Sequence, residues 1–90
     1  MTSISIIIPT YNEEASIIQV LNAIETAKEE NQQVRFEVIV INDSSTDGTL
    51  SLLSANKGLY DVLVSTPKNS GKGGAVVLGL TKATGEYVLF

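Results

Sequence analysis

The sequence contains no cysteine and no histidine, and each absence excludes a kind of functional site. Without cysteine the chain can form neither a disulfide framework nor a thiolate metal site. Without histidine it lacks the commonest general base and metal ligand of proteins. Any acid–base or metal chemistry on this chain would therefore depend on aspartate and glutamate.

Long apolar runs and an excess of positive charge are missing as well. No apolar segment approaches the roughly 20 residues that span a bilayer, and no basic segment precedes an apolar stretch as in a signal peptide. We therefore expect a cytoplasmic chain. The net charge of −4 argues against a nucleic-acid partner, although Lys68 and Lys72 lie close enough together for a local phosphate site.

The residues that are present are typical of an α/β domain. With 43% hydrophobic residues, the 90-residue chain is one small domain or part of a larger one. Short apolar runs at residues 4–8, 36–41, 61–64 and 87–90 predict four strands, of which the first two are expected to be buried. Amphipathic helical segments separate them, so the order β-α-β-α-β-α-β implies a parallel sheet with helices on its faces. The expected inward helix positions are Ile17, Val20, Leu21, Ile24 and Ala27, then Leu50 and Leu53, then Val76, Val77, Leu80 and Ala83.

The chain reaches Phe90 within the fourth predicted strand, without a polar cap or tail. Four strands alone would also leave an open sheet edge. We therefore expect residues 1–90 to be the incomplete N-terminal portion of a domain that continues beyond residue 90. We also expect the open edge to favour self-association.

Polar turns follow three of the predicted strands, at residues 9–13, 42–48 and 66–74. All three leave the same edge of a parallel sheet, where ligands bind in open α/β folds. The glycine-rich third turn offers backbone N–H groups to an anion, and the acidic turns offer oxygen acceptors to a ligand. Asp43 directly follows a buried strand, so we expect its carboxylate at the centre of a shared cleft, free to accept hydrogen bonds.

Purely structural roles are open for most of these residues. Asn12 and Asp47 suit helix caps better than ligand contacts, and Glu13 and Glu14 complement the positive end of a helix dipole. Asp43 is the hardest to explain structurally, because later residues are better placed to cap the next helix. The remaining structural explanations are core-edge packing for Tyr11, a solvated position for Lys72, and backbone freedom for Gly71, Gly73 and Gly74.

Two familiar phosphate-binding motifs do not fit the sequence. A P-loop needs a glycine, four residues and then Gly-Lys-Ser/Thr, but Thr66 stands at the first glycine position and Gly73 follows Lys72. A dinucleotide-binding fingerprint needs glycines after the first strand, where residues 9–13 read Pro-Thr-Tyr-Asn-Glu. The same segment lacks the glycine-rich, basic loop typical of nucleotidyltransferases, so that class is not favoured.

Four segments, in order, resemble the N-terminal, nucleotide-binding part of family 2 glycosyltransferases of the GT-A fold. They are residues 6–14 (IIIPTYNEE), 40–49 (VINDSSTDGT), 69–75 (NSGKGGA) and 83–90 (ATGEYVLF), and the resemblance covers essentially the whole chain. It implies a Rossmann-like GT-A half-domain of an enzyme that transfers a hexosyl group from a UDP- or GDP-sugar to an acceptor, with Mg²⁺ or Mn²⁺. The last two segments are most similar to the branch that glycosylates polyprenyl or dolichyl phosphate, which implies a lipid-phosphate acceptor at the cytoplasmic face of a membrane.

The resemblance also implies roles for individual residues. Asp43 would accept a hydrogen bond from the base and Glu13 would contact the ribose, whereas Asn42 departs from the acidic residue usual at its position. The family's metal-binding Asp-x-Asp motif and its general base would follow Phe90. Residues 1–90 would then hold no catalytic residue, no metal and no transferase activity of their own. The other implied contacts are a wall around the base, formed by Pro9, Thr10 and Tyr11, and a position near the sugar-phosphate path for Lys72.

The alternative from a different class is a nucleotide-binding or structural α/β half-domain without transfer activity. The two hypotheses differ in the residues that follow Phe90. Only the enzyme requires an Asp-x-Asp motif there.

Overall fold

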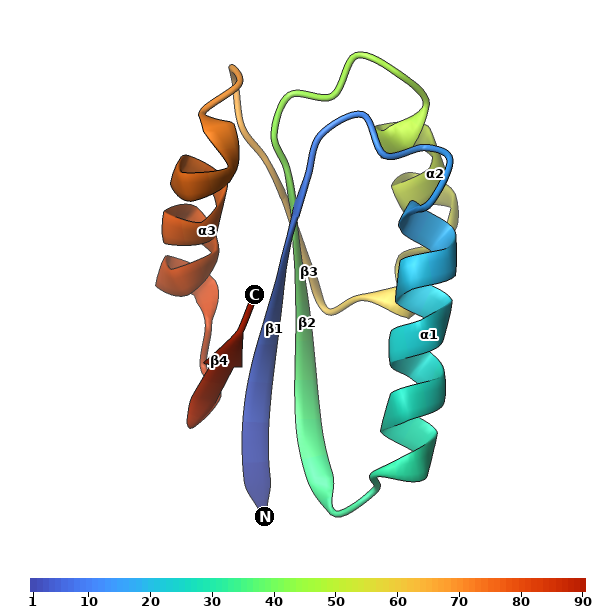
Figure 1. Cartoon of the computed structure of the whole chain (residues 1–90), viewed down its shortest axis with the longest axis vertical. Helices are drawn as coiled ribbons and strands as arrows, with labels where there is room; N and C mark the ends of the chain where they lie inside the picture. Colours follow the sequence, from blue (N-terminus) through green and yellow to red (C-terminus); the bar gives the residue numbers. More distant parts are fainter.

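The computed structural model describes all 90 residues and shows a four-stranded parallel sheet with helices on both faces (Figure 1). In chain order the elements are β1 (Thr2–Thr10), α1 (Ile17–Glu30), β2 (Val34–Asn42), α2 (Thr49–Ala55), the 3-10 helix η1 (Lys57–Leu59), β3 (Val62–Ser65), α3 (Gly71–Lys82) and β4 (Tyr87–Leu89). The sheet order is β3-β2-β1-β4, with α1 and α2 on one face and α3 on the other. The predicted α/β alternation is therefore confirmed. None of the helices combines the length and the apolar character that a bilayer span requires.

The pairing of β1 with β2 brings two of the polar turns together. The two strands pair over nine residues, from Thr2 opposite Val34 to Thr10 opposite Asn42. The N–H of Asp43 then donates to the carbonyl of Thr10 at 2.8 Å, so the pairing continues to the point where both turns begin. The segments after β1 and β2 therefore start side by side at the carboxyl edge of the sheet.

β1 is longer than predicted because Pro9 does not end it. The backbone of Thr10 faces β2, and successive strand residues direct their backbone groups to opposite sides, so Pro9 faces the β4 side. β4 pairs with β1 only as far as Ile6. No neighbouring strand therefore requires the N–H that proline lacks.

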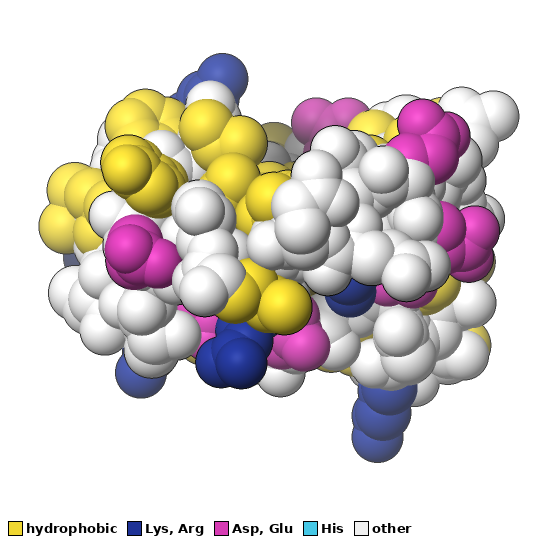
Figure 2. Space-filling view, turned by 90° about the horizontal axis from the view of Figure 1, so that it is seen from below, with side chains coloured by type: hydrophobic (Ala, Val, Ile, Leu, Met, Phe, Trp, Pro, Cys, Tyr) yellow, Lys and Arg dark blue, Asp and Glu magenta, His cyan; other side chains and the backbone are white.

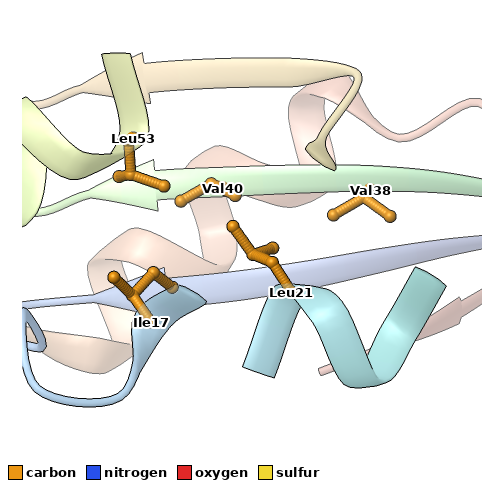
Figure 3. Close-up of a cluster of buried hydrophobic side chains, with 5 residues drawn as sticks. All are labelled: Ile17, Leu21, Val38, Val40 and Leu53. Carbon is orange, nitrogen blue, oxygen red and sulfur yellow. The ribbon is translucent and has the colours of Figure 1, made fainter. Parts of the chain in front are cut away.

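Two buried clusters hold the helices to the sheet. Alternate β2 residues point to opposite faces, so Val38 and Val40 pack under α1 and α2, whereas Ile39 and Ile41 pack under α3. All four are 0% exposed, which confirms the buried strand. Each side chain of this kind contributes about 1.5–3 kcal/mol by leaving water. The first cluster is completed by Ile17, Leu21 and Leu53 (Figure 3), and the second by Ile7 and Ala75.

The fully buried residues of α3 are small, contrary to the prediction. Ala75 and Gly79 are buried, whereas Val77 and Leu80 are 62% and 45% exposed. The cause is the closeness of the helix to the sheet, since a Cβ on Gly79 would collide with the side chain of Ile7. A large residue at the contact would force α3 away from β1.

The inward faces of α1 and α2 are narrower than predicted. Ile17, Leu21 and Leu53 are buried as expected, but Val20 and Leu50 are 42% and 41% exposed. A helix on one face of a sheet directs one stripe of residues toward it, and these two lie on the flank of that stripe. Of the remaining predicted positions, Ile24, Val76 and Ala83 are half-buried and Ala27 is exposed.

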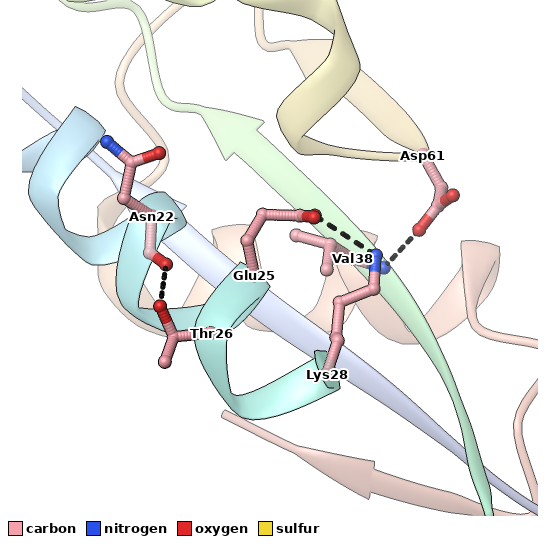
Figure 4. Close-up of polar contacts among 6 residues, drawn as sticks. All are labelled: Asn22, Glu25, Thr26, Lys28, Val38 and Asp61. Carbon is pink, nitrogen blue, oxygen red and sulfur yellow. Dashed lines mark hydrogen bonds and ion pairs between the residues drawn. The ribbon is translucent and has the colours of Figure 1, made fainter. Parts of the chain in front are cut away.

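β3 begins one residue later than predicted because Asp61 pairs with β2 through its side chain. The Asp61 carboxylate accepts the N–H of Val38 at 2.7 Å, while the Asp61 N–H donates to the Val38 carbonyl at 2.9 Å (Figure 4). Val38 is fully buried, so its N–H has no access to water as an alternative partner. Asp61 therefore extends the β2–β3 pairing and satisfies a buried donor.

Replacing Asp61 by alanine should lower the free energy of unfolding by about 1–3 kcal/mol, because the buried N–H of Val38 loses its partner. Chemical denaturation measures this loss. The matched control is Glu25→Ala, which removes the partly exposed ion pair with Lys28 at 3.1 Å (Figure 4). Such a pair on a helix surface is worth about 0.2–0.5 kcal/mol. Equal losses in the two variants would contradict the role assigned to Asp61.

A polar network ties the start of β4 to β1 and β2. The Glu37 carboxylate accepts the N–H of Thr84 at 2.9 Å and the hydroxyl of Ser5 at 2.8 Å. The hydroxyl of Ser5 accepts the N–H of Gly85 at 2.8 Å, and a Cβ on Gly85 would lie 2.7 Å from the Ser5 nitrogen. Desolvation acts to raise the pKa of Glu37, but hydrogen bonds from Thr84 and Ser5 outweigh it and hold that pKa below its usual value. Thr84 and Gly85 therefore have structural roles in this fold.

β4 forms one edge of the sheet, and large apolar side chains are exposed there. Tyr87, Leu89 and Phe90 are 62%, 54% and 74% exposed. Figure 2, which shows the molecule from below, has hydrophobic side chains gathered on one half of the surface. Unpaired strand edges recruit other strands, so self-association through β4 stays a prediction for this chain.

Candidate functional site

One cleft of about 510 Å³ opens at the carboxyl edge of the sheet, between the ends of β1 and β2 and the first turn of α3. Its lining includes every residue that the sequence singled out for nucleotide contacts. Three further lining residues, Asn69, Gly71 and Ala75, were not named as site residues, although they belong to the same glycine-rich segment as Lys72. The predicted residues that the structure brings together around the cleft are Pro9, Thr10, Tyr11, Glu13, Asp43 and Lys72.

Asn12 connects the turn after β1 to the turn after β2, and it does not cap α1. Its backbone has a φ of 51°, its carbonyl oxygen Oδ1 accepts the N–H of Thr46 at 2.7 Å, and its own N–H donates to Ser45 Oγ at 3.1 Å. The N-cap position of α1 is Ser16, which makes no side-chain cap hydrogen bond. Capping was the expected role of Asn12, and that prediction is wrong because its side chain bonds to a turn more than 30 residues away.

Glu14 and Asp47 reinforce the same connection between the two turns. The Glu14 carboxylate accepts the N–H of Gly48 at 2.9 Å, and the Glu14 N–H donates to Asp47 at 3.3 Å. Asp47 also accepts the N–H of Thr49 in the first turn of α2 at 2.9 Å, although Gly48 holds the N-cap position. Desolvation acts to raise the pKa of Asp47, but bonds from Thr49 and Glu14 outweigh it and keep that pKa below its usual value. The two turns form one cross-linked platform.

Glu13 is held by this platform at the edge of the cleft. Its N–H donates to Thr49 Oγ1 at 2.9 Å, and its carboxylate oxygen Oε2 accepts the hydroxyl of Ser16 at 3.3 Å. The other carboxylate oxygen accepts no hydrogen bond from the protein. Glu13 therefore offers an acceptor to a ligand from a fixed backbone position.

Asp43 is 3% exposed, and its carboxylate is not free, contrary to expectation. Oδ1 accepts the hydroxyl of Thr66 at 2.8 Å and both the N–H and the hydroxyl of Ser70, at 2.9 and 2.8 Å. Oδ2 receives only the same Ser70 N–H, at 3.1 Å. The difference arises because the third polar turn folds back over the end of β2. Asp43 still lines the cleft, and Oδ2 keeps capacity for another donor.

These hydrogen bonds also keep Asp43 ionised. The N–H of Ser70 has the largest effect on the pKa of Asp43, and the hydroxyls of Ser70 and Thr66 act in the same direction. Together they outweigh desolvation, so the pKa of Asp43 lies below its usual value. The cleft therefore contains a carboxylate anion at neutral pH.

The start of α3, which also lines the cleft, carries backbone donors and a positive charge. Gly71 begins α3 with a φ of 77°, a conformation that favours glycine, and its N–H donates to Asn69 Oδ1 at 3.0 Å. Lys72 follows in the first helical turn and forms no ion pair. A helix N-terminus and a lysine together favour an anion. The cleft thus combines carboxylate acceptors with a lysine and the N-terminus of a helix.

No three acidic side chains lie close enough together to hold a metal ion. Glu13 and Asp43 are the carboxylates of the cleft, and Asp43 already uses most of its capacity within the protein. A cation such as Mg²⁺ is often held by one or two carboxylates together with water and substrate phosphates.

Known proteins match this chain over nearly its full length. The poly(ribitol-phosphate) beta-N-acetylglucosaminyltransferase TarS of Staphylococcus aureus is 37% identical over 92 residues, covering 100% of this chain and 16% of the relative. The dolichyl-phosphate beta-glucosyltransferase ALG5C of Trichomonas vaginalis is 36% identical, covering 92% of this chain and 26% of its own length. The chain therefore spans about a sixth to a quarter of the length of these relatives.

Solved structures are similar to this chain in fold as well as in sequence. S. aureus TarS 1-349 in complex with UDP matches with a TM-score of 0.81 and 36% identity, covering 100% of this chain and 26% of that one. The mannosyltransferase PcManGT from Pyrobaculum calidifontis, in complex with GDP-Man and Mn²⁺, matches with a TM-score of 0.79 and 32% identity, covering 94% of this chain and 25% of that one. The fold is that of GT-A glycosyltransferases. The model of the family described as Glycosyl transferase family 2 matches residues 5–90, and this chain belongs to that family.

Proposed function

We propose that residues 1–90 are the N-terminal nucleotide-binding portion of a longer glycosyltransferase that transfers a hexosyl group from a UDP- or GDP-sugar. The observation that carries the proposal is the cleft, which is lined by the carboxylates Glu13 and Asp43 and by Lys72 in the first turn of α3. A nucleoside diphosphate carries the complementary groups, with donors on its base and ribose and negative charge on its phosphates. Family relatives in complex with UDP and with GDP-Man support the same ligand class.

The proposed contacts follow the chemistry of each side chain. Asp43 Oδ2 accepts the imide N–H of a pyrimidine or the equivalent edge of guanine, and Glu13 accepts the ribose hydroxyls. Lys72 and the first N–H groups of α3 bind the diphosphate. The wall around the base is formed by Pro9, Thr10 and Tyr11.

The divalent cation and the general base would depend on residues after Phe90. Among residues 1–90 no three acidic side chains lie together, so further ligands to Mg²⁺ or Mn²⁺ would come from later residues, the nucleotide phosphates and water. The cation would neutralise the diphosphate leaving group, and a carboxylate would deprotonate the acceptor. We therefore expect no sugar transfer by residues 1–90 alone.

The acceptor that we propose is a polyprenyl phosphate, reached at the cytoplasmic face of a membrane. The support is the similarity to a dolichyl-phosphate beta-glucosyltransferase and to an undecaprenyl-phosphate 4-deoxy-4-formamido-L-arabinose transferase of Aeromonas hydrophila, which is 36% identical over 89 residues. TarS, whose printed acceptor is poly(ribitol-phosphate), is also similar to this chain. Assays with both kinds of acceptor separate the two.

Removing the positive charge of Lys72 tests the diphosphate end of the cleft. Lys72→Met should weaken binding of UDP or GDP roughly tenfold, because a charge-assisted contact to phosphate is lost. Binding of the nucleoside alone should not change. Calorimetric titration of the protein that contains this chain measures both.

The matched control is Lys68→Met, which removes the same charge from the same glycine-rich segment outside the cleft. Its nucleotide affinity should equal that of the wild type. If the two substitutions lowered nucleotide affinity equally, the loss would reflect only the overall charge of the segment. That result would contradict a phosphate contact by Lys72.

A further inference from the structure

The two carboxylate oxygens of Asp43 have different surroundings. Oδ1 accepts three donors, from the Thr66 hydroxyl and from the N–H and hydroxyl of Ser70, at 2.8–2.9 Å. A carboxylate oxygen has about two lone-pair directions, so Oδ1 has none left for a ligand. Oδ2 shares a single N–H at 3.1 Å. Only Oδ2 can therefore meet a donor in the cleft.

Ser70 supplies two of these three donors, and its hydroxyl does not cap α3. It occupies the N-cap position of α3, where a serine hydroxyl normally accepts an N–H from the first helical turn, yet it makes no such bond. Its hydroxyl donates instead to Asp43 at 2.8 Å. In the first turn of α3, the N–H of Gly71 donates to Asn69 Oδ1 at 3.0 Å, and Ser70 caps none of the N–H groups there.

Gly74 makes room for this arrangement. A Cβ at position 74 would lie 2.9 Å from the Cβ of Ser70 and 3.0 Å from its hydroxyl oxygen. Any larger residue there would displace the Ser70 side chain. The glycine at position 74 is thus matched to the orientation of the Ser70 side chain.

Building on the proposed function, we propose that Ser70 is a positioning residue for nucleotide recognition. It fixes Oδ1 of Asp43, directs Oδ2 toward the base, and joins that carboxylate to the N-terminus of α3, which faces the diphosphate. The base end and the phosphate end of the cleft are thereby linked through one side chain.

A change in the protonation of Asp43 provides a readout without any ligand. The titratable groups that line the cleft with Asp43 are Tyr11, Glu13 and Lys72. Ser70→Ala keeps the N–H and removes only the hydroxyl, so the pKa of Asp43 should rise toward its usual value. Carbon-13 NMR titration of the Asp43 carboxyl group, in the protein that contains this chain, measures this rise.

The role in binding is tested by a double-mutant cycle with UDP and GDP as probes. Ser70→Ala should lower the affinity for the nucleotide that the wild type binds by roughly three- to tenfold, as expected for one lost hydrogen bond. In an Asp43→Asn background the same substitution should have almost no further effect. Ser70→Thr, which keeps a hydroxyl, should restore affinity. Ser54→Ala, which removes an exposed serine hydroxyl from α2, is the control and should change nothing.

The possible results separate this inference from the proposed function. The positioning role would be overturned if Ser70→Ala left nucleotide affinity unchanged. It would also be overturned if Ser70→Ala lowered the affinity as much in the Asp43→Asn background as in the wild type. In both cases the cleft would remain the nucleotide site. An unchanged pKa of Asp43 in Ser70→Ala would overturn it as well. If the wild-type protein bound no nucleoside diphosphate, the proposed function would fail, and the coupling with it.

Discussion

Asp43→Asn is expected to weaken nucleotide binding by at least roughly tenfold while the fold survives. Oδ1 accepts three donors, so the asparagine must keep its carbonyl oxygen there. Its amide nitrogen then takes the place of Oδ2 and presents a donor to the cleft. A base N–H, itself a donor, would meet another donor where the wild type offers a charged acceptor.

Calorimetric titration with UDP and GDP, together with melting curves, measures both parts of this prediction. Asp61→Asn is the control, because Asp61 lies outside the cleft and should not affect affinity. If Asp43→Asn bound every nucleoside diphosphate as tightly as the wild type, Asp43 would be a turn-forming residue only. The proposed base contact would then be lost.

Gly79→Ala is expected to destabilise the fold by about 1–3 kcal/mol, the usual range for overpacking a tight contact. The added Cβ would collide with the Ile7 side chain where α3 packs against β1. In a domain of this size, each kcal/mol corresponds to a fall in Tm of about 4–8 °C. Urea denaturation gives the free energy directly.

The control has the opposite expected sign. Gly73 lies in the same helix, and a Cβ there would meet nothing within 4 Å. Gly73→Ala should therefore be neutral or stabilise the protein by up to about 1 kcal/mol, since alanine is the better helix former. If both substitutions had the same effect, close packing at Gly79 would not be the cause.

The strands could be predicted from the sequence because they depend on local composition. The meeting of the polar turns at one edge of the sheet could then be predicted from the alternation of strands and helices. The β-branched run at 38–41 is buried on both faces wherever a parallel sheet carries helices on both sides. The turns meet because parallel strands end at the same edge. This is why the residues expected at the site do line one cleft.

The face of α3 that packs against the sheet could not be predicted in the same way. More than one face of this helix is apolar, and the large residues Val77 and Leu80 favour a core-facing position in the sequence pattern. The helix instead approaches β1 through Ala75 and Gly79 and exposes Val77 and Leu80. That choice depends on the separation between helix and sheet, which no local pattern encodes.

The hydrogen-bond partners of the site residues could not be predicted from the sequence either. Asp43 bonds to residues 23 and 27 positions later, and Asn12 bonds to a turn 34 positions later. Serine, threonine and asparagine near a helix start are read first as caps, because local bonds are their commonest use. The bond from the Ser70 hydroxyl to Asp43, in place of a cap on α3, depends on the third turn folding over the end of β2.

The most direct test of the account is a crystal structure of the protein that contains this chain with UDP or GDP bound. We predict the base at the end of β2, with its N–H about 3 Å from Asp43 Oδ2, and the diphosphate between Lys72 and the first turn of α3. A nucleotide bound outside this cleft, or bound within it with the base away from Asp43, would contradict the account.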